Sequence, residues 1–247
     1  MDVSGISLGL LGGFIFNAIN NYFRSRTLAR IGSENGDEKI LGRWYNIRKI
    51  RKTDRLRIAF AGAGGVGKGT LGEMLTKELD GIFIPSHISE TGKMIGLKDS
   101  FLDNPSDELR ITYQWSIMIG QMYQERAATL STRQALIFER SVVDYLGYLL
   151  NYKENDILKE RDRYIEIVTE WTKVSYDVII YMKPDFTPLD SKVNTWKERG
   201  EGRGRTGEII LSYLKFIKSS GARFHLLEVG GSIEERFDVI KNFIKSI

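Results

Sequence analysis

The residues best suited to chemistry form a glycine-rich stretch from position 62 to position 70, with the order Gly-x-x-Gly-x-Gly-Lys-Gly-Thr. Glycines let the backbone curl until successive N–H groups point at one anion. Lys68 could then reach the β and γ phosphates of a nucleoside triphosphate. The stretch predicts a phosphate-binding loop with ATP and Mg²⁺ as cofactors. Its binding residues would be Gly62, Gly64, Gly65, Val66, Gly67, Lys68, Gly69 and Thr70.

A second reactive group, Glu139-Arg140-Ser141, follows the apolar run 135–138. A carboxylate at the end of a strand beside the phosphate-loop strand is where such folds place catalytic or metal-linked acids. Glu139 could accept a proton from an acceptor hydroxyl, or help to hold Mg²⁺ through water. Thr70 would lie near the phosphates or Mg²⁺. Arg140 could hold an acceptor phosphate or steady a transferred one. A surface ion pair between the two side chains is the plainer alternative.

A third group of charges lies between positions 191 and 206, where glycines alternate with Arg199, Arg203 and Arg205. This composition predicts a mobile basic lid that closes over a transferring phosphoryl group and excludes water. The alternative is a charged loop that is simply solvated.

The elements that must position these groups alternate along the chain. Strands are expected at 58–61, 81–85, 135–138, 177–182 and 224–229. Helices are expected at 71–79, 104 to about 130, 142–152, 156–173, from about 207, and at 233–245, with Glu90 in a polar loop after the second strand. Strands alternating with helices predict a parallel sheet with right-handed crossovers. The fold class is therefore α/β, a three-layer sandwich around a five-stranded parallel sheet.

The N-terminal part differs in composition, so we predict an arm at 1–56 and one domain at 57–247. Positions 3–23 carry no charge and are followed by Arg24, Arg26 and Arg30. Three interpretations remain open: a helix docked on a protein partner or on its own domain, a helix on a membrane surface, and a membrane span. We expect a cytoplasmic protein, with residues 1–30 as the segment that would attach it to a membrane or an assembly.

The charge is also concentrated near the N-terminus. Residues 1–57 hold 11 Lys and Arg against 5 Asp and Glu, whereas residues 58–247 hold 25 against 27. A nucleic-acid-binding face over the whole protein is therefore not favoured. The chain has no cysteine and two histidines that are far apart, which excludes disulfides and thiolate metal sites and makes a zinc site a poor expectation.

Several of these motifs resemble those of known kinases. The glycine-rich loop is similar to the phosphate loop of adenylate kinases, with Gly64 where many of those have proline. Phe138-Glu-Arg-Ser-Val142 resembles the Glu-Arg-Ser segment of deoxynucleoside kinases and is similar to the Asp-Arg-Tyr segment of thymidylate kinases. Tyr113-Gln114 resembles the Phe-Gln pair of deoxynucleoside kinases, whose glutamine hydrogen-bonds the acceptor base.

The resemblance covers about residues 57–247 and implies a fold of the phosphate-loop kinase type. It implies Tyr113 and Gln114 in substrate binding, Glu90 or Glu139 as the base, and Arg199, Arg203 and Arg205 as lid arginines. The sequence departs from the deoxynucleoside kinases at Gly69, which separates Lys68 from Thr70 where those enzymes carry a Lys-Ser or Lys-Thr pair. Another departure is the missing Asp-Arg pair after Glu-Arg-Ser, for which Asp144 is only an approximate substitute.

The expected function is an ATP-dependent kinase that acts on a deoxynucleoside or a nucleoside monophosphate. The loop favours a nucleotide acceptor, whereas Glu139-Arg140-Ser141 favours a nucleoside, so both remain open. A regulatory or assembly-associated NTPase docked through the arm is a second hypothesis. A kinase of nucleic-acid 5′ ends is a third. The sequence gives no indication of the oligomeric state.

Overall fold

The computed structural model describes residues 55–94, 107–151, 158–184 and 200–247. Residues 1–54 of the predicted N-terminal arm, the helix start at Asn104 and Arg199 lie outside the described residues. Five strands form one parallel sheet in the order β2-β3-β1-β4-β5. They are β1 Leu56–Ala61, β2 Ile82–Ile84, β3 Ala135–Phe138, β4 Val178–Met182 and β5 His225–Val229. The five predicted strands and the parallel sheet are confirmed.

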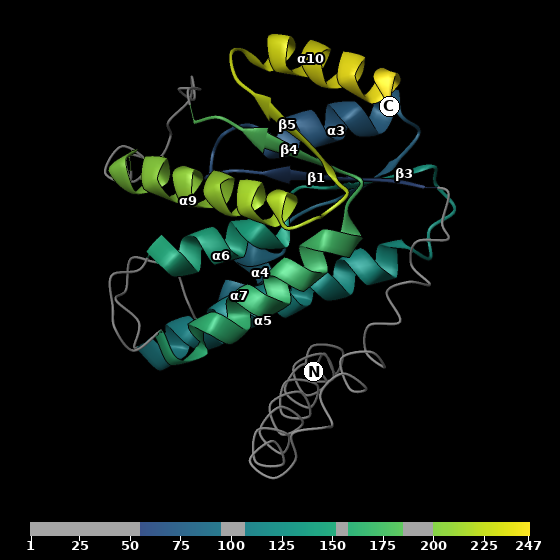
Figure 1. The fold of residues 1–247 in the computed structure, drawn as a ribbon. Coiled ribbons are helices and arrows are strands. Elements are labelled where there is room, and N and C mark those ends of the chain that lie inside the picture. Colours follow the sequence, from purple (N-terminus) through teal and green to yellow (C-terminus); the bar gives the residue numbers. More distant parts are fainter. Residues whose placement is uncertain (1–54, 95–106, 152–157, 185–199) are drawn as a thin grey trace. The chain divides into compact units, whose positions relative to one another are not determined.

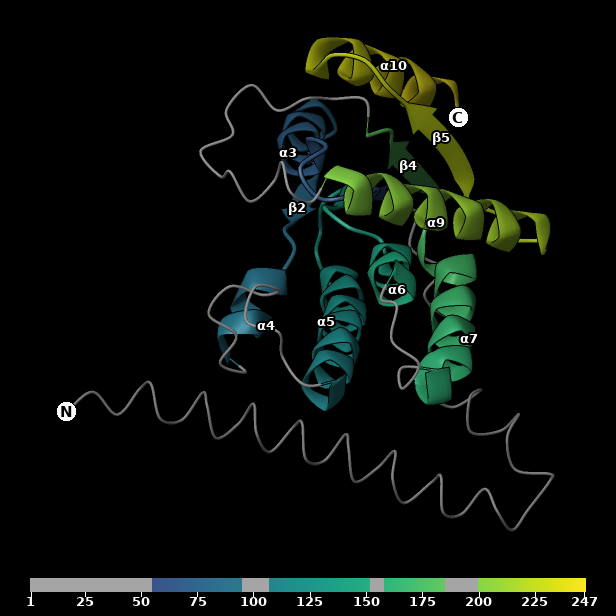
Figure 2. The ribbon, with the colours of Figure 1, turned by 90° about the vertical axis from the view of Figure 1, so that its left-hand side faces the viewer.

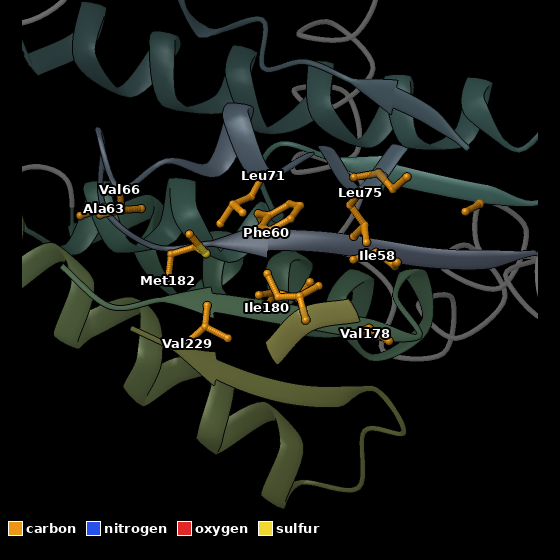
Figure 3. Packing of buried hydrophobic residues seen from close by; sticks show 13 residues of the cluster. Ile58, Phe60, Ala63, Val66, Leu71, Leu75, Val178, Ile180, Met182 and Val229 are labelled. Atoms are coloured by element: carbon orange, nitrogen blue, oxygen red, sulfur yellow. The ribbon is translucent and has the colours of Figure 1, made fainter. Parts of the chain in front are cut away.

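The central strands are buried because helices cover both faces of the sheet. All five residues of β4 and five of the six in β1 are buried, which explains why both strands are almost continuously apolar. Figure 3 shows Phe60 of β1 and Ile180 of β4 packed with Leu71 and Leu75 of the helix that follows the glycine-rich loop. This cluster fixes the start of that helix beside the carboxyl end of β1.

The helices form two layers of unequal size (Figures 1 and 2). One face of the sheet carries α3 Lys68–Glu78 and α10 Ile233–Ser246. The other carries α4 Ile88–Met94, α5 Asp107–Ala128, α6 Val142–Asn151, α7 Leu158–Ser175 and α9 Gly200–Ser219. The first turn of α10 is closed by a capping box, in which Ser232 and Glu235 bond each other's backbone N–H groups. None of the helices in the described ranges is both long and apolar enough for a membrane crossing.

Two boundary predictions are wrong, and both concern polar sequence. Glu90 lies in helix α4 rather than in a loop, and its side chain is exposed. Helix α9 begins at Gly200 rather than near position 207, so Arg203 and Arg205 lie in its first turns, and their role as lid arginines stays a prediction. The early start of α9 is explained by packing. Thr206 and Ile210 are buried against α6, and this tertiary contact stabilises a helix whose first turn is rich in glycine.

Candidate phosphate-binding and catalytic site

The glycine-rich loop connects β1 to α3 and has glycine at three positions of positive φ, which are Gly62, Gly65 and Gly67. Gly62 has φ +133°, and a Cβ there would lie 2.7 Å from the carbonyl oxygen of Met182 in β4. Gly67 caps α3 with φ +87°, so the helix begins at Lys68 with no side-chain cap from the described residues and no acidic residue in its first turn. The N–H groups at this end of α3 are thus suited to an anionic ligand.

Lys68 turns back onto the loop that it follows. Its ammonium donates to the carbonyl oxygens of Gly62 at 2.5 Å and Ala63 at 2.7 Å, and it lies 3.6 Å from Asp144 Oδ2. The side chain is 4% exposed. Burial and the nearby charge of Arg140 lower the pKa of Lys68 to about 7, against the opposing charge of Asp144. The lysine is therefore held in place by carbonyl oxygens and one carboxylate.

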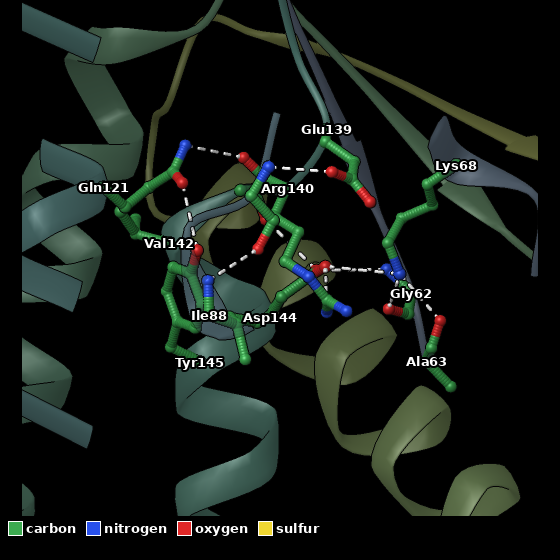
Figure 4. A network of polar contacts seen from close by, with 12 residues as sticks. Gly62, Ala63, Lys68, Ile88, Gln121, Glu139, Arg140, Val142, Asp144 and Tyr145 are labelled. Atoms are coloured by element: carbon green, nitrogen blue, oxygen red, sulfur yellow. Dashed lines mark hydrogen bonds and ion pairs between the residues drawn. The ribbon is translucent and has the colours of Figure 1, made fainter. Parts of the chain in front are cut away.

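Asp144, in the first turn of α6, connects the loop to the segment after β3. One carboxylate oxygen accepts the Gly62 N–H at 3.0 Å, and the other lies 3.5 Å from Arg140 Nη1. Asp144 is fully buried, and burial raises the pKa of its carboxyl group while Lys68 and Arg140 oppose that rise. Figure 4 shows the Arg140 and Lys68 side chains converging on this carboxylate. Asp144 thus lies with the phosphate loop and holds two cations at once.

Glu139 spans the gap between β2 and α3. Its Oε2 accepts the N–H of Ser86 at 2.7 Å, just beyond β2. Its Oε1 would lie 3.6 Å from a Cβ on Gly69, in the first turn of α3. The parallel register pairs Ala59 with Phe138, which brings the carboxyl ends of β1 and β3 together. Because β3 pairs with β1, Glu139 lies at the end of a strand next to the phosphate-loop strand, as the sequence predicted.

Arg140 offers donors that fit an anion. Its Nε and Nη1 are buried and form no hydrogen bond with any described residue, although the ion pair with Asp144 remains. The guanidinium also lies over the Tyr148 ring, with 5.8 Å from Cζ to the ring centroid. A phosphate oxygen in front of Arg140 would satisfy donors that the described chain leaves open.

A family model described as an AAA domain matches residues 57–236, which is more than half of the chain. The chain belongs to this AAA domain family. No curated protein sequence matches it.

Solved structures similar to this AAA domain protein identify its fold. Deoxyadenosine kinase from M. mycoides with bound dATP is 19% identical, with a TM-score of 0.54, and the match covers 77% of this chain and 100% of that one. Thymidylate kinase from Candida albicans is 16% identical, with a TM-score of 0.57 and coverage of 78% and 92%. The NadR protein in complex with NR is 14% identical, with a TM-score of 0.54 and coverage of 76% and 50%. The fold is that of the phosphate-loop nucleoside and nucleotide kinases, as the sequence predicted.

The other predicted site residues of the AAA domain protein lie on the helices around this edge of the sheet. Tyr113 and Gln114 are buried in α5, and the Tyr113 hydroxyl donates to the Ile88 carbonyl oxygen at 3.1 Å. Burial raises the pKa of Tyr113 to about 12, opposed by the charge of Arg140. Thr70 and Arg205 are exposed, on α3 and α9 respectively. The structure thus brings together the loop, Glu139, Arg140 and Asp144, with Tyr113 facing Arg140.

Sequence reasoning missed four residues that support the site. Arg236 of α10 is fully buried and donates to the carbonyl oxygens of Val66, Gly231 and Lys183 at 2.9, 2.8 and 3.2 Å. It therefore connects the phosphate loop with the segments after β4 and β5. Gln121, Glu125 and Tyr176 form a buried network behind Arg140. The sequence carries one weak signal for the network, because Gln121 and Glu125 are polar residues one turn apart on a helix.

Proposed function

We propose that this protein is an ATP-dependent phosphotransferase whose acceptor is a deoxynucleoside or a nucleoside monophosphate. One observation carries the proposal: Lys68, Glu139, Arg140 and Asp144 converge where the glycine-rich loop meets the carboxyl ends of β1 and β3. Phosphoryl transfer needs alignment and positive charge more than covalent help from the protein. This arrangement supplies both.

In the proposed reaction, the oxygen of an acceptor hydroxyl or phosphate group attacks the γ-phosphorus of ATP. The bond from that phosphorus to the β–γ bridging oxygen breaks, and ADP leaves. Lys68 moves its contacts from the Gly62 and Ala63 carbonyl oxygens to the β and γ phosphates. Arg140 steadies the transferred phosphoryl group or an acceptor phosphate. Glu139 accepts the proton when the acceptor is a hydroxyl.

Mg²⁺, when bound, would neutralise the phosphate charge as it develops on the leaving group. Magnesium in phosphate sites is usually held by one or two side chains together with phosphate oxygens and water. Glu139 beside Gly69, and Thr70 in the same turn of α3, fit that requirement. Tyr113 and Gln114 would line the acceptor pocket from α5, with Gln114 reading the base.

The deciding experiment measures ADP formation from ATP and Mg²⁺ against a panel of nucleosides and nucleoside monophosphates. We expect one acceptor to stimulate ADP formation and to become phosphorylated. Lys68→Ala should reduce this turnover by about a thousandfold, because it removes the cation that contacts the phosphates. Lys77→Ala is the matched control, since Lys77 is an exposed lysine in the same helix.

Two results would contradict the proposal. Equal turnover whatever acceptor is added would indicate an NTPase without an acceptor pocket, which is the second hypothesis. Full turnover by Lys68→Ala would remove the assignment of the loop itself. The docking role of residues 1–56 stays a prediction that this experiment does not address.

A further inference from the structure

A buried carboxylate that the proposed reaction does not use lies behind Arg140. Glu125 of α5 is 3% exposed and accepts three hydrogen bonds from side chains. The donors are the Tyr176 hydroxyl at 2.6 Å, the Trp171 indole N–H at 2.6 Å and Gln121 Nε2 at 2.9 Å. A buried acid with three donors is fully satisfied as a carboxylate, so the network stabilises the ionised form.

Two of these donors also hold the chain that follows β3. The Tyr176 hydroxyl accepts the Val142 N–H at 3.0 Å, and Gln121 Nε2 donates to the Arg140 carbonyl oxygen at 3.1 Å. The Tyr145 hydroxyl donates to Gln121 Oε1 at 3.0 Å and fixes the orientation of that amide. Figure 4 shows the Gln121, Arg140 and Tyr145 contacts. The peptide groups on both sides of Ser141 are therefore held by side chains that contact Glu125.

The orientation of each hydrogen bond depends on the charge of Glu125. Because Tyr176 accepts the Val142 N–H, its single hydroxyl proton is directed to Glu125. A proton on Glu125 would compete with the Tyr176 hydroxyl, the Trp171 N–H or the Gln121 N–H for the same oxygens. When Glu125 is ionised, the Tyr176 hydroxyl and the Gln121 amide both donate to it. This is therefore the form in which Tyr176 remains free to accept the Val142 N–H and Gln121 holds its place beside Arg140.

The segment held in this way carries the groups that would contact phosphate. Glu139 precedes Arg140, and Asp144 follows Val142 by two residues. Arg140 Nη1 lies 3.5 Å from Asp144 Oδ2. Because the guanidinium is carried by the Arg140 backbone, a shift of that backbone would move the guanidinium relative to the loop. A misplacement of about 1 Å in such a group can cost about a hundredfold in rate.

We propose that Glu125, acting through Gln121 and Tyr176, is a positioning residue that sets the backbone of residues 140–142 for phosphoryl transfer. The role in transfer rests on the proposed function, whereas the fixing of the segment does not. Within the described ranges, the hydrogen bonds of the Glu125 carboxylate go to Tyr176, Trp171 and Gln121 and not to the loop or Lys68. Its effect is carried by the carbonyl group of Arg140 and the N–H group of Val142.

Two variants separate positioning from simple loss of stability. Tyr176→Phe removes the contact to Val142 together with one hydrogen bond to Glu125. Trp171→Phe removes a hydrogen bond to Glu125 of the same length but leaves the contacts of residues 140–142 in place. Both variants keep an aromatic side chain, so the comparison holds burial roughly constant. Gln121→Met, which removes the Arg140 contact, takes the place of Tyr176→Phe if that variant does not fold.

The first measurement is hydrogen exchange of the peptide that contains Val142. We expect Tyr176→Phe to raise its exchange rate by at least about tenfold, and Trp171→Phe to change it by less than about threefold. Equal exchange in both variants would overturn the proposal, whatever the activity of the protein.

The second measurement is the split between kcat and KM in the phosphoryl transfer assay. Tyr176→Phe should lower kcat by about tenfold to a hundredfold with the KM for ATP changed by less than about threefold, because the loop and Lys68 are untouched. Trp171→Phe should keep kcat within about threefold of the wild type. Faster exchange with unchanged kcat would overturn the role in transfer. A wild-type protein that transfers no phosphoryl group would refute the proposed function instead, and the exchange result would still decide whether Tyr176, the partner of Glu125, holds the segment at Val142.

Discussion

At the scale of single residues, the site is arranged around one buried carboxylate shared by two cations. Asp144 lies 3.6 Å from Lys68 and 3.5 Å from Arg140, and it also accepts the Gly62 N–H. Removing water from such charges is costly, and the mutual attraction of the three groups offsets part of that cost. A triphosphate would give both cations a second anionic partner. Lys68 and Arg140 thus contact Asp144 in the free protein and could contact phosphate groups when a ligand is bound.

The lysine charge gives a prediction about pH. The pKa of Lys68 is lowered to about 7 in the free protein, and phosphates beside it would raise that pKa. Because the lowered pKa leaves part of the free lysine neutral above about pH 7, we expect ATP binding to be accompanied by proton uptake at the Lys68–Asp144 pair. We expect the ATP affinity to fall between pH 7.5 and 9 by up to about tenfold per pH unit.

Titration calorimetry in two buffers with different ionisation enthalpies would measure this proton uptake. Asp144→Asn should shift the loss of affinity to lower pH, because it removes the charge that supports the lysine ammonium. A flat affinity over this range, with no buffer dependence, would show that Lys68 is already charged in the free protein.

Two glycines of the loop, Gly62 and Gly69, should respond differently to replacement by alanine. At Gly62, φ is +133° and a Cβ would lie 2.7 Å from the Met182 carbonyl oxygen, so Gly62→Ala should reduce the free energy of unfolding by about 2–4 kcal/mol. At Gly69 the backbone is helical and a Cβ would lie 3.6 Å from Glu139, an ordinary contact. Gly69→Ala should therefore change stability by less than about 1 kcal/mol. Urea denaturation of both variants checks this contrast, and equal losses would contradict it.

At the scale of secondary-structure elements, the phosphate loop is supported from behind by α10 rather than by β1 and α3 alone. Arg236 of α10 donates to the carbonyl oxygens of Val66, Gly231 and Lys183. A Cβ on Gly67 would meet the Ile233 side chain at 2.7 Å, which shows how closely the start of α10 approaches the loop. The last helix of the chain therefore takes part in shaping the first loop of the site.

Arg236→Met tests that support. It would remove the donors to the buried Val66 carbonyl oxygen and to the partly buried Gly231 and Lys183 carbonyl oxygens, and we expect the free energy of unfolding to fall by about 3–5 kcal/mol. Arg236→Lys should recover part of the loss, because an ammonium keeps the charge but lacks the fork of a guanidinium. Lys241→Ala in the same helix is the control, since it removes only a partly exposed ion pair with Glu78 and should cost less than about 1 kcal/mol. Similar losses for Arg236→Met and Lys241→Ala in thermal unfolding would count against the support.

At the scale of the whole molecule, the helical layer of α5, α6 and α7 encloses a titratable group whose charge affects the stability of the fold. Burial raises the pKa of Glu125 to about 7, while hydrogen bonds from Tyr176, Trp171 and Gln121 and the charge of Arg57 oppose the rise. The Tyr145 hydroxyl of α6 also faces Glu125. Between pH 4.5 and 7 the folded protein thus binds more protons at this position than the unfolded chain.

Glu125 should therefore make the protein less stable as the pH rises through this range. The sign follows from linkage, because stability falls with pH wherever the folded state holds more protons. A shift from 4.5 to about 7 corresponds to roughly 3 kcal/mol. Glu125→Gln should flatten the pH dependence of the free energy of unfolding between pH 4.5 and 7, whatever its effect on absolute stability.

Urea denaturation at several pH values measures this slope. Glu170→Gln, at an exposed position of α7, should keep the wild-type slope. The same slope in Glu125→Gln and the wild type would show that Glu125 titrates normally in the folded protein.

Local sequence was sufficient to determine the strands and the phosphate loop. The apolar runs at 58–61, 135–138 and 178–182 are short-range patterns that predict buried strands, and all three form the middle of the sheet. The loop was equally visible because glycine spacing, Lys68 and a following helix are adjacent in the chain. The extent of α9 was not visible, since its glycine-rich first turn predicts a loop unless the packing of Thr206 and Ile210 is known.

Only the tertiary structure decided what surrounds the site. The strand order places β3 next to β1, and that pairing brings Glu139 close to Gly69 and Asp144 close to Lys68. Glu125 meets Tyr176, which is 51 positions away, and Arg236 meets Val66, which is 170 positions away. Helical periodicity shows which residues share one face of a helix, but a buried polar residue needs partners that come from other elements. Those partners are fixed by packing across the whole domain, so a single sequence does not reveal them.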